Sequence, residues 1–103
     1  MERFDKVNIL TKANVYFDGK CVSHTIELAD GSKKTLGVIF PSRLTFNTNA
    51  PERMEIIDGK CHIKISPENS YTSYQAGESF SVPANSSFEI ETVETLNYIC
   101  HFG

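Results

Sequence analysis

Four polar residues in one short segment have side chains suited to binding and activating a polar substrate. Arg43, Thr45 and Asn47 alternate along the chain, and Glu52 follows shortly afterwards. An arginine can hold an anionic group through two parallel hydrogen bonds, and Thr and Asn donate to anionic or hydroxyl oxygens. A carboxylate accepts hydroxyl protons or stabilises developing positive charge. Two alternatives stay open: Arg43 as a solvated charge at a strand end, and Glu52 as a rim residue.

Aromatic residues later in the chain form a second group of candidates. Phe80, Phe88 and Tyr98 could sandwich a flat heterocycle, because an aromatic side chain stacks on any ring that has a π face. Tyr74 and Tyr98 also carry a phenol that could reach a carbonyl of such a ring. Ordinary core packing is the alternative, above all for Phe80.

Two further residues could contact an anion. Lys20 is a possible cation, with a simply solvated lysine as the alternative, and His101 could offer a proton-bearing ring nitrogen. The sequence contains no Ser-His-Asp order, P-loop or dinucleotide fingerprint, so acyl transfer and nucleotide hydrolysis have no support.

The elements that must position these side chains are short strands. Turn-forming pairs such as Asp30-Gly31, Asp58-Gly59 and Ala76-Gly77 recur at short intervals. Between the turns apolar and polar residues alternate, as in 88–92, which is typical of strands with one buried face. No segment keeps a convincing helical period. The pattern predicts an all-β domain, either a barrel or a sandwich.

Size and charge exclude several classes of protein. The chain has 103 residues, enough for one domain with a single core. A formal charge of -3 without a basic run argues against nucleic acid as a partner. No apolar run approaches the roughly 20 residues that span a membrane, and residues 1–6 lack the layout of a secretory signal. We therefore expect a cytoplasmic protein with no membrane partner.

The three cysteines point to no special chemistry. Cys21, Cys61 and Cys100 are far apart and form no Cys-x-x-Cys pair, and no histidine stands at zinc-finger spacing. We expect free, reduced and mostly buried thiols.

Two segments, 36–40 and 97–102, are apolar on both faces. A small barrel can bury only one face of a strand, so the other face needs a cover. A second copy of the chain would provide it and would also protect exposed strand edges. These segments predict a homodimer.

The segment 77–88 resembles the second sequence motif of the cupins. Gly77 opens a strand, Pro83 closes it, and the metal-binding histidine of the motif would follow on the next strand. Phe88 occupies that position here. An aromatic ring cannot serve as a metal ligand of this kind.

The first cupin motif is also altered at its metal ligands. Glu52 and Gly59 keep the spacing of that motif, whereas Thr45 and Asn47 stand where its His-x-His pair would be. The resemblance implies a small cupin-like β-barrel of jelly-roll type that uses neither metal nor another cofactor. It also implies that Arg43, Thr45 and Asn47 face the inside of the barrel.

From Asn14 to Phe102 the chain resembles the small pyrimidine/purine nucleoside phosphorylases, a family of compact cupins. The resemblance makes 14–103 the cupin-like domain and 1–13 an N-terminal extension. The residues that carry it are Tyr16-Phe17-x-Gly19-Lys20, Gly37-Val38, Thr45-Phe46-x-Thr48, Pro51-Glu52-x-Met54, Gly59, Tyr74-x-Ala76-Gly77-x-x-Phe80-x-Val82-Pro83 and Tyr98-x-Cys100.

The resemblance implies phosphorolysis of purine and pyrimidine nucleosides, with inorganic phosphate as co-substrate, to a free base and a pentose 1-phosphate. Catalytic roles would fall to Glu52, Thr45 and Asn47. The expected substrate-binding residues are Arg43, Lys20, Tyr74, Phe80, Phe88, Tyr98 and His101. Two alternatives remain: a non-catalytic cupin that binds a sugar or nucleotide, and a dimeric interaction module with a filled barrel.

Overall fold

The computed structural model describes residues 2–102, which form an all-β domain. The one helical element among these residues is a 3-10 turn, η1 (Phe17–Gly19). The strands are β1 (Asn8–Ile9), β2 (Asn14–Tyr16), β3 (Cys21–Glu27), β4 (Lys33–Ile39), β5 (Ser42–Asn47), β6 (Glu52–Asp58), β7 (Lys60–Ile65), β8 (Thr72–Gln75), β9 (Ser79–Val82), β10 (Ser87–Thr92) and β11 (Leu96–Phe102). The prediction of a small all-β domain is confirmed.

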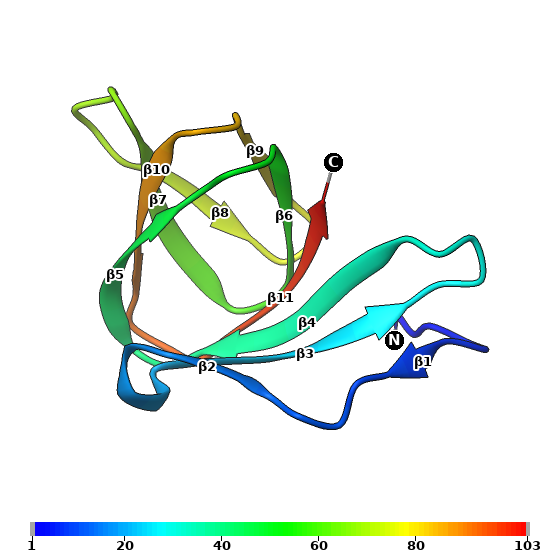
Figure 1. Ribbon diagram of the computed structural model, residues 1–103. Coiled ribbons are helices and arrows are strands. Elements are labelled where there is room, and N and C mark those ends of the chain that lie inside the picture. Colours follow the sequence, from blue (N-terminus) through cyan, green and yellow to red (C-terminus); the bar gives the residue numbers. More distant parts are fainter. Residues whose placement is uncertain (1, 103) are drawn as a thin grey trace.

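The strands form two antiparallel sheets that face each other (Figure 1). The larger sheet has the order β1-β3-β4-β11-β6-β9, with β2 also paired to β3, and the smaller has the order β5-β10-β7-β8. The hairpin of β3 and β4 projects beyond the body of the domain, at the right of Figure 1. β1 lies within the predicted N-terminal extension and pairs with β3.

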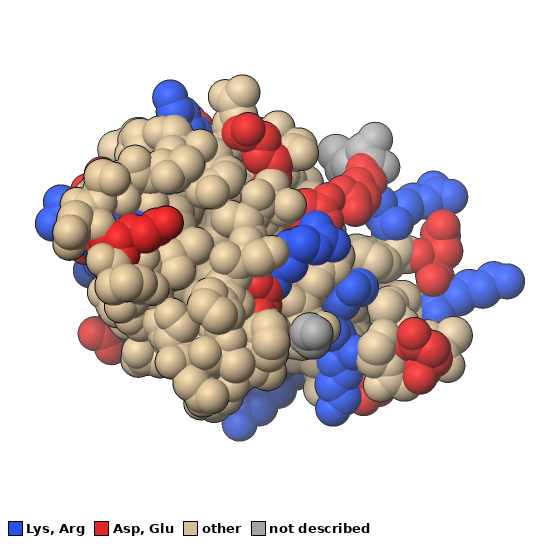
Figure 2. All heavy atoms as spheres, turned by 90° about the horizontal axis from the view of Figure 1, so that it is seen from above, with Lys and Arg blue, Asp and Glu red and all other residues tan. Residues whose placement is uncertain are grey.

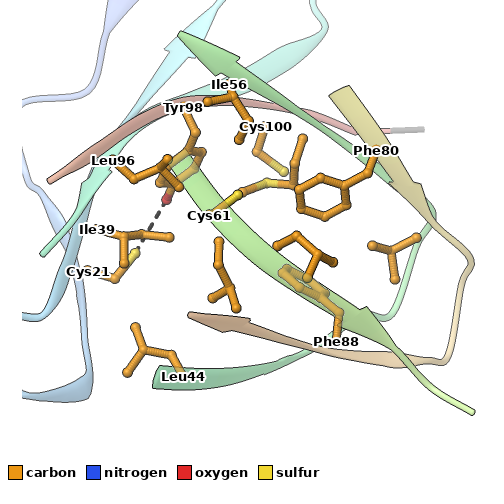
Figure 3. Close-up of a cluster of buried hydrophobic side chains, with 14 residues drawn as sticks. Cys21, Ile39, Leu44, Ile56, Cys61, Phe80, Phe88, Leu96, Tyr98 and Cys100 are labelled. Carbon is orange, nitrogen blue, oxygen red and sulfur yellow. Dashed lines mark hydrogen bonds between the residues drawn. The ribbon is translucent and has the colours of Figure 1, made fainter. Parts of the chain in front are cut away.

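The core between the sheets is built by strict alternation. Phe88, Ile90 and Thr92 of β10 are buried, and Cys61 and Ile63 of the neighbouring β7 point to the same side. Figure 3 shows these strands sending their apolar side chains toward those of β6, β9 and β11. All three cysteines are free and buried, as predicted.

A close approach between Gly37 and Tyr98 fixes the middle of the larger sheet. A Cβ at Gly37 would lie 2.7 Å from Tyr98 Oη and 2.8 Å from Ser23 Cβ, so only glycine leaves room for the ring. The Tyr98 hydroxyl in turn lies 3.4 Å from Cys21 Sγ (dashed in Figure 3). The phenol therefore links β3, β4 and β11 from inside.

The outer face of the larger sheet is apolar at its centre, as the two-sided segments predicted. The Glu2–Phe4 segment lies over this face and borders a hollow of about 400 Å³. The sheet residues that line the hollow include Val22, Leu36, Val38, Ile57 and Ile99. No helix within residues 2–102 is long and apolar enough to cross a membrane.

The orientation of β5 differs from the prediction. Leu44 is 5% exposed and joins the core, whereas Arg43 and Thr45 are exposed on the outer face of the smaller sheet. Arg43 Nη2 there donates to Glu91 Oε2 at 2.9 Å. The prediction that these two residues face inward is wrong, because burying Leu44 and Phe46 removes more apolar surface from water. Asn47 lies at the end of the strand, beside the interior pocket described below.

Paired substitutions in β5 test this orientation. Leu44→Ala should lower the free energy of unfolding by about 2–5 kcal/mol, because it leaves a cavity in the core. Thr45→Ala should change it by no more than about 0.5 kcal/mol, since an exposed side chain is shortened. Urea unfolding measures both values. Equal losses would contradict the orientation of β5.

Candidate functional site

A pocket of about 170 Å³ lies between the inner faces of the two sheets, at the end where β6 begins and β11 ends. Both polar and aromatic side chains reach it. It is lined by Tyr16, Ser23, Thr35, Phe46, Asn47, Glu52, Met54, Phe88, Tyr98, Cys100 and Phe102. Tyr16 and Phe102 are each 48% exposed and form part of its opening.

Glu52, the first residue of β6, supplies the carboxylate of the pocket. It is half-buried, and Cys100 Sγ donates to its Oε1 at 3.6 Å. Burial raises the pKa of Glu52, and the thiol hydrogen bond offsets part of this effect. Burial, together with the nearby Glu52, raises the pKa of the Cys100 thiol to about 12, so the thiol stays protonated and can donate. Glu52 thus lines the pocket, and its partner there is a thiol rather than a cation or a hydroxyl group.

An aromatic wall borders the pocket on the side of the smaller sheet. The rings of Phe46 and Phe88 stack with centroids 5.4 Å apart and an interplanar angle of 18°. Tyr16 and Phe17 contact Phe46 edge to face at 6.4 and 5.2 Å. Phe88 is thus a pocket residue that also packs in the core. A flat apolar group entering the pocket would meet this wall.

A hydroxyl-bearing wall lies opposite, on the larger sheet. Asn14 Nδ2 donates to Ser23 Oγ at 3.3 Å and to Thr25 Oγ1 at 3.2 Å, so each hydroxyl accepts from Asn14 and can itself donate to another acceptor. Thr35 lies beside Thr25 on the adjacent strand. Burial raises the pKa of Tyr98 far above its usual range, so its hydroxyl stays protonated.

Several predicted site residues lie outside the pocket. Phe80 and Tyr74 pack against each other in or beside the core at 5.1 Å. Lys20 is an exposed residue just before β3. His101 lies on the outer face of the larger sheet, where Lys34 Nζ donates to its Nδ1 at 2.7 Å and its Nε2 donates to Glu55 Oε1 at 2.8 Å.

The pocket therefore brings together Glu52, Asn47, Phe88 and Tyr98 from the predicted set. It adds residues that sequence reasoning missed. Ser23 and Thr35 carry no motif, and only the register of β3, β4 and β11 brings them beside Tyr98. Cys100 and Phe102 could have been found from the alternation that starts at Tyr98.

The polar groups of the pocket fall into two chemical types, one carboxyl group and several neutral donors. None of the described residues that line it is a Lys, Arg or His. Within residues 2–102, no three His, Cys, Asp or Glu side chains come together in a way that could hold a metal ion. The arrangement can bind hydroxyl groups, stack on a flat ring and stabilise positive charge.

Known proteins resemble this chain over its whole length. The family model described as pyrimidine/purine nucleoside phosphorylase matches residues 11–102. Proteins of that name from Thiobacillus denitrificans and Methylococcus capsulatus are 64% and 56% identical to this chain. Each comparison covers all of this chain and all of the relative.

Solved structures agree with this relationship. A crystal structure from Acinetobacter sp. ADP1 superposes with a TM-score of 0.97 at 53% identity, and 98% of each chain is covered. Bacillus subtilis oxalate decarboxylase, 20% identical, shares the fold alone, with a TM-score of 0.64 over 81% of this chain and 26% of the other. The chain belongs to the pyrimidine/purine nucleoside phosphorylase family.

Proposed function

We propose that this protein is a nucleoside phosphorylase of broad specificity, which converts purine and pyrimidine nucleosides and inorganic phosphate to a free base and a pentose 1-phosphate. Family membership supports the reaction type. The observation that carries the proposal is one half-buried carboxylate, Glu52, between an aromatic wall and a hydroxyl-bearing wall.

The chemistry balances without a redox step. An oxygen of HPO₄²⁻ forms a bond to the anomeric carbon while the bond from that carbon to the base nitrogen breaks. The base leaves with the bonding electron pair, and the phosphate proton ends on the base. Positive charge builds up on the sugar ring in between, as in other glycosidic cleavages.

Glu52 is suited to stabilise that charge. Its partly desolvated carboxylate interacts with a developing cation more strongly than a carboxylate in water would. The same group can accept hydrogen bonds from ribose hydroxyls, and Asn47 at the pocket edge can add another. We therefore propose catalytic roles for Glu52 and Asn47, whereas exposed Thr45 does not line this pocket.

Broad specificity follows from the way the base is held. Apolar contact with the wall of Phe46 and Phe88 requires only a flat ring, which every nucleobase has. A site that read the edge of one base through buried hydrogen bonds would reject the others strongly. The aromatic wall makes no such demand.

We further infer that the two sheets form a small cupin-like barrel of jelly-roll type. The superposition on oxalate decarboxylase supports this architecture. Thr45, Asn47 and Phe88 occupy the positions where the two cupin motifs carry metal ligands. The ring of Phe88 is packed between Phe46 and Phe80. We propose that the reaction needs phosphate but no metal or organic cofactor.

A direct assay tests the reaction. Protein pretreated with a chelator should release uracil from uridine, and a purine base from a purine nucleoside, only when inorganic phosphate is present. The pentose 1-phosphate should form in equal amount. Binding of nucleoside without turnover would instead favour a sensing protein, and neither binding nor turnover would favour an interaction module.

Substitution of Glu52 tests its role in catalysis. Glu52→Gln keeps the shape but removes the charge, so kcat/KM should fall by about a hundredfold or more with the fold intact. Glu94→Gln, in the exposed loop after β10, is the matched control and should leave kcat/KM unchanged. Equal kinetics of wild type and Glu52→Gln would remove Glu52 from the mechanism.

Glu52→Gln should be more stable than the wild type, although it is less active. Burial raises the pKa of Glu52, so the wild type loses stability as the pH rises through that value and the carboxylate forms. Glutamine stays neutral, so Glu52→Gln should melt above the wild type at about pH 8, and this advantage should shrink at about pH 4. A melting difference that does not vary with pH would contradict this account.

We also propose that the protein is a homodimer. The apolar outer face of the larger sheet, with Leu36, Val38 and Ile99, supports this assembly. Equilibrium sedimentation should give about twice the chain mass of 11.5 kDa at micromolar concentration. A mass equal to one chain would contradict it.

A further inference from the structure

Phosphorolysis requires a phosphate dianion close to the sugar, yet the described lining of the pocket contains no cation. The carboxylate of Glu52 also repels an anion. A basic side chain at the edge of the pocket must therefore offset this repulsion. The alternation of each strand shows which side chains could do so, because only residues on the inner faces point toward the pocket.

The basic side chains near the pocket lie mostly on the outer faces. Lys34, Arg53 and His101 form one row across β4, β11 and β6 on the outside of the larger sheet, around Glu55. On the outside of the smaller sheet, Arg43 and Lys64 are held by carboxylates of β10. None of these five residues shares a face with the pocket.

Lys33, the first residue of β4, is on the inner face. Positions two apart in a strand share a face, so Lys33 points to the same side as Thr35, which lines the pocket, and Gly37, which lies under the Tyr98 ring. Positions two apart in a strand are separated by about 7 Å. The ammonium group, on a flexible four-carbon chain, can therefore lie over the hydroxyl of Thr35.

Lys34 pairs with His101, and Phe102 pairs with Glu52. Continuing the β4–β11 register by one residue brings Lys33 level with Phe102, and so into the row of Glu52. Two strand spacings separate Lys33 from Glu52, about 10 Å between their backbones. That span leaves room for a sugar beside Glu52 and a phosphate beside Lys33.

In the structure Lys33 is only loosely engaged. Its Nζ lies 3.9 Å from Glu27 Oε2, and its side chain is 58% exposed. An exposed pair at this distance contributes little stability. Shorter charge-assisted hydrogen bonds to phosphate oxygens would replace it readily. Figure 2 shows Lys and Arg side chains, mixed with Asp and Glu, on the side where the β3–β4 hairpin projects, at the right in both views.

We propose that Lys33, with the hydroxyls of Thr25 and Thr35, forms the site that holds inorganic phosphate for attack on the sugar. The proposal rests on the phosphorylase function proposed above. Thr25 already accepts a hydrogen bond from Asn14, so its own proton is free to donate to a phosphate oxygen. The three groups come from adjacent strands, β3 and β4, which hold them on one wall.

Kinetics with phosphate as the varied substrate tests this site. Lys33→Gln should raise the KM for phosphate about tenfold or more, the loss expected for a hydrogen bond to a charged group. The KM for the nucleoside should change much less, and Lys33→Arg should restore most of the phosphate affinity. An unchanged KM for phosphate in Lys33→Gln would overturn the proposal.

Two further variants sharpen the test. Lys34→Gln is the matched control, because it removes the same charge from the next residue on the opposite face, and it should leave the KM for phosphate near the wild-type value. Glu27→Gln removes the competing carboxylate and should lower this KM. Equal effects of Lys33→Gln and Lys34→Gln would show only a general effect of charge and would overturn the proposal.

A binding measurement separates this proposal from the function on which it rests. Inorganic phosphate, titrated into ¹⁵N-labelled protein at constant ionic strength, should shift the amide signals of Thr25, Lys33 and Thr35 in the wild type but not in Lys33→Gln. Such shifts without base release would refute the phosphorylase function and keep the anion site. Base release without these shifts would keep the function and refute the site.

Discussion

The packing of Tyr98 against Gly37 is the contact on which the rest of the interior depends. On the side of Tyr98 away from the pocket, the neighbouring row of Cys21, Ile39 and Leu96 is fully buried and completes the apolar core. On the pocket side, the inward-facing residues carry hydroxyl, thiol and carboxyl groups. The Tyr98 ring thus closes the core and forms the floor of the pocket, and its buried hydroxyl requires the partner that Cys21 provides. A side chain at position 37 would push the ring toward the pocket.

The polar end of the interior carries an energetic cost that the apolar end does not. Half-burying a carboxylate beside a weak thiol donor costs free energy, which is why the pKa of Glu52 is raised. Natural sites often keep such groups because the reaction needs them, and a well-packed core offsets the cost elsewhere. Here the opposite end of the same sheets supplies that core. A domain of this size can therefore hold a reactive pocket without a second domain to enclose it.

The sequence predicted the strands well because period-two alternation is a local property, as the buried series Phe88, Ile90 and Thr92 shows. The predicted orientation of β5 was wrong, because the residues on either face of this strand could plausibly have pointed inward. The cupin analogy favoured Thr45, but burying polar groups without a metal to bind offers no gain, and Leu44 took the interior. The motif identified Glu52 as a site residue. The sequence did not identify Ser23 and Thr35, because the cross-strand register brings them to the pocket and a single sequence does not reveal that register.

The phosphate site proposed at the edge of the pocket agrees with the energetics of charge. A dianion is costly to transfer from water, and a fully enclosed site would need several buried cations to compensate. At the exposed start of β4 a bound anion would keep part of its hydration, so one lysine and two hydroxyls can suffice. The sugar and base, which carry no charge, can then occupy the drier space beside Glu52 and the aromatic wall. In this proposal the polarity of each substrate matches the depth at which it would bind.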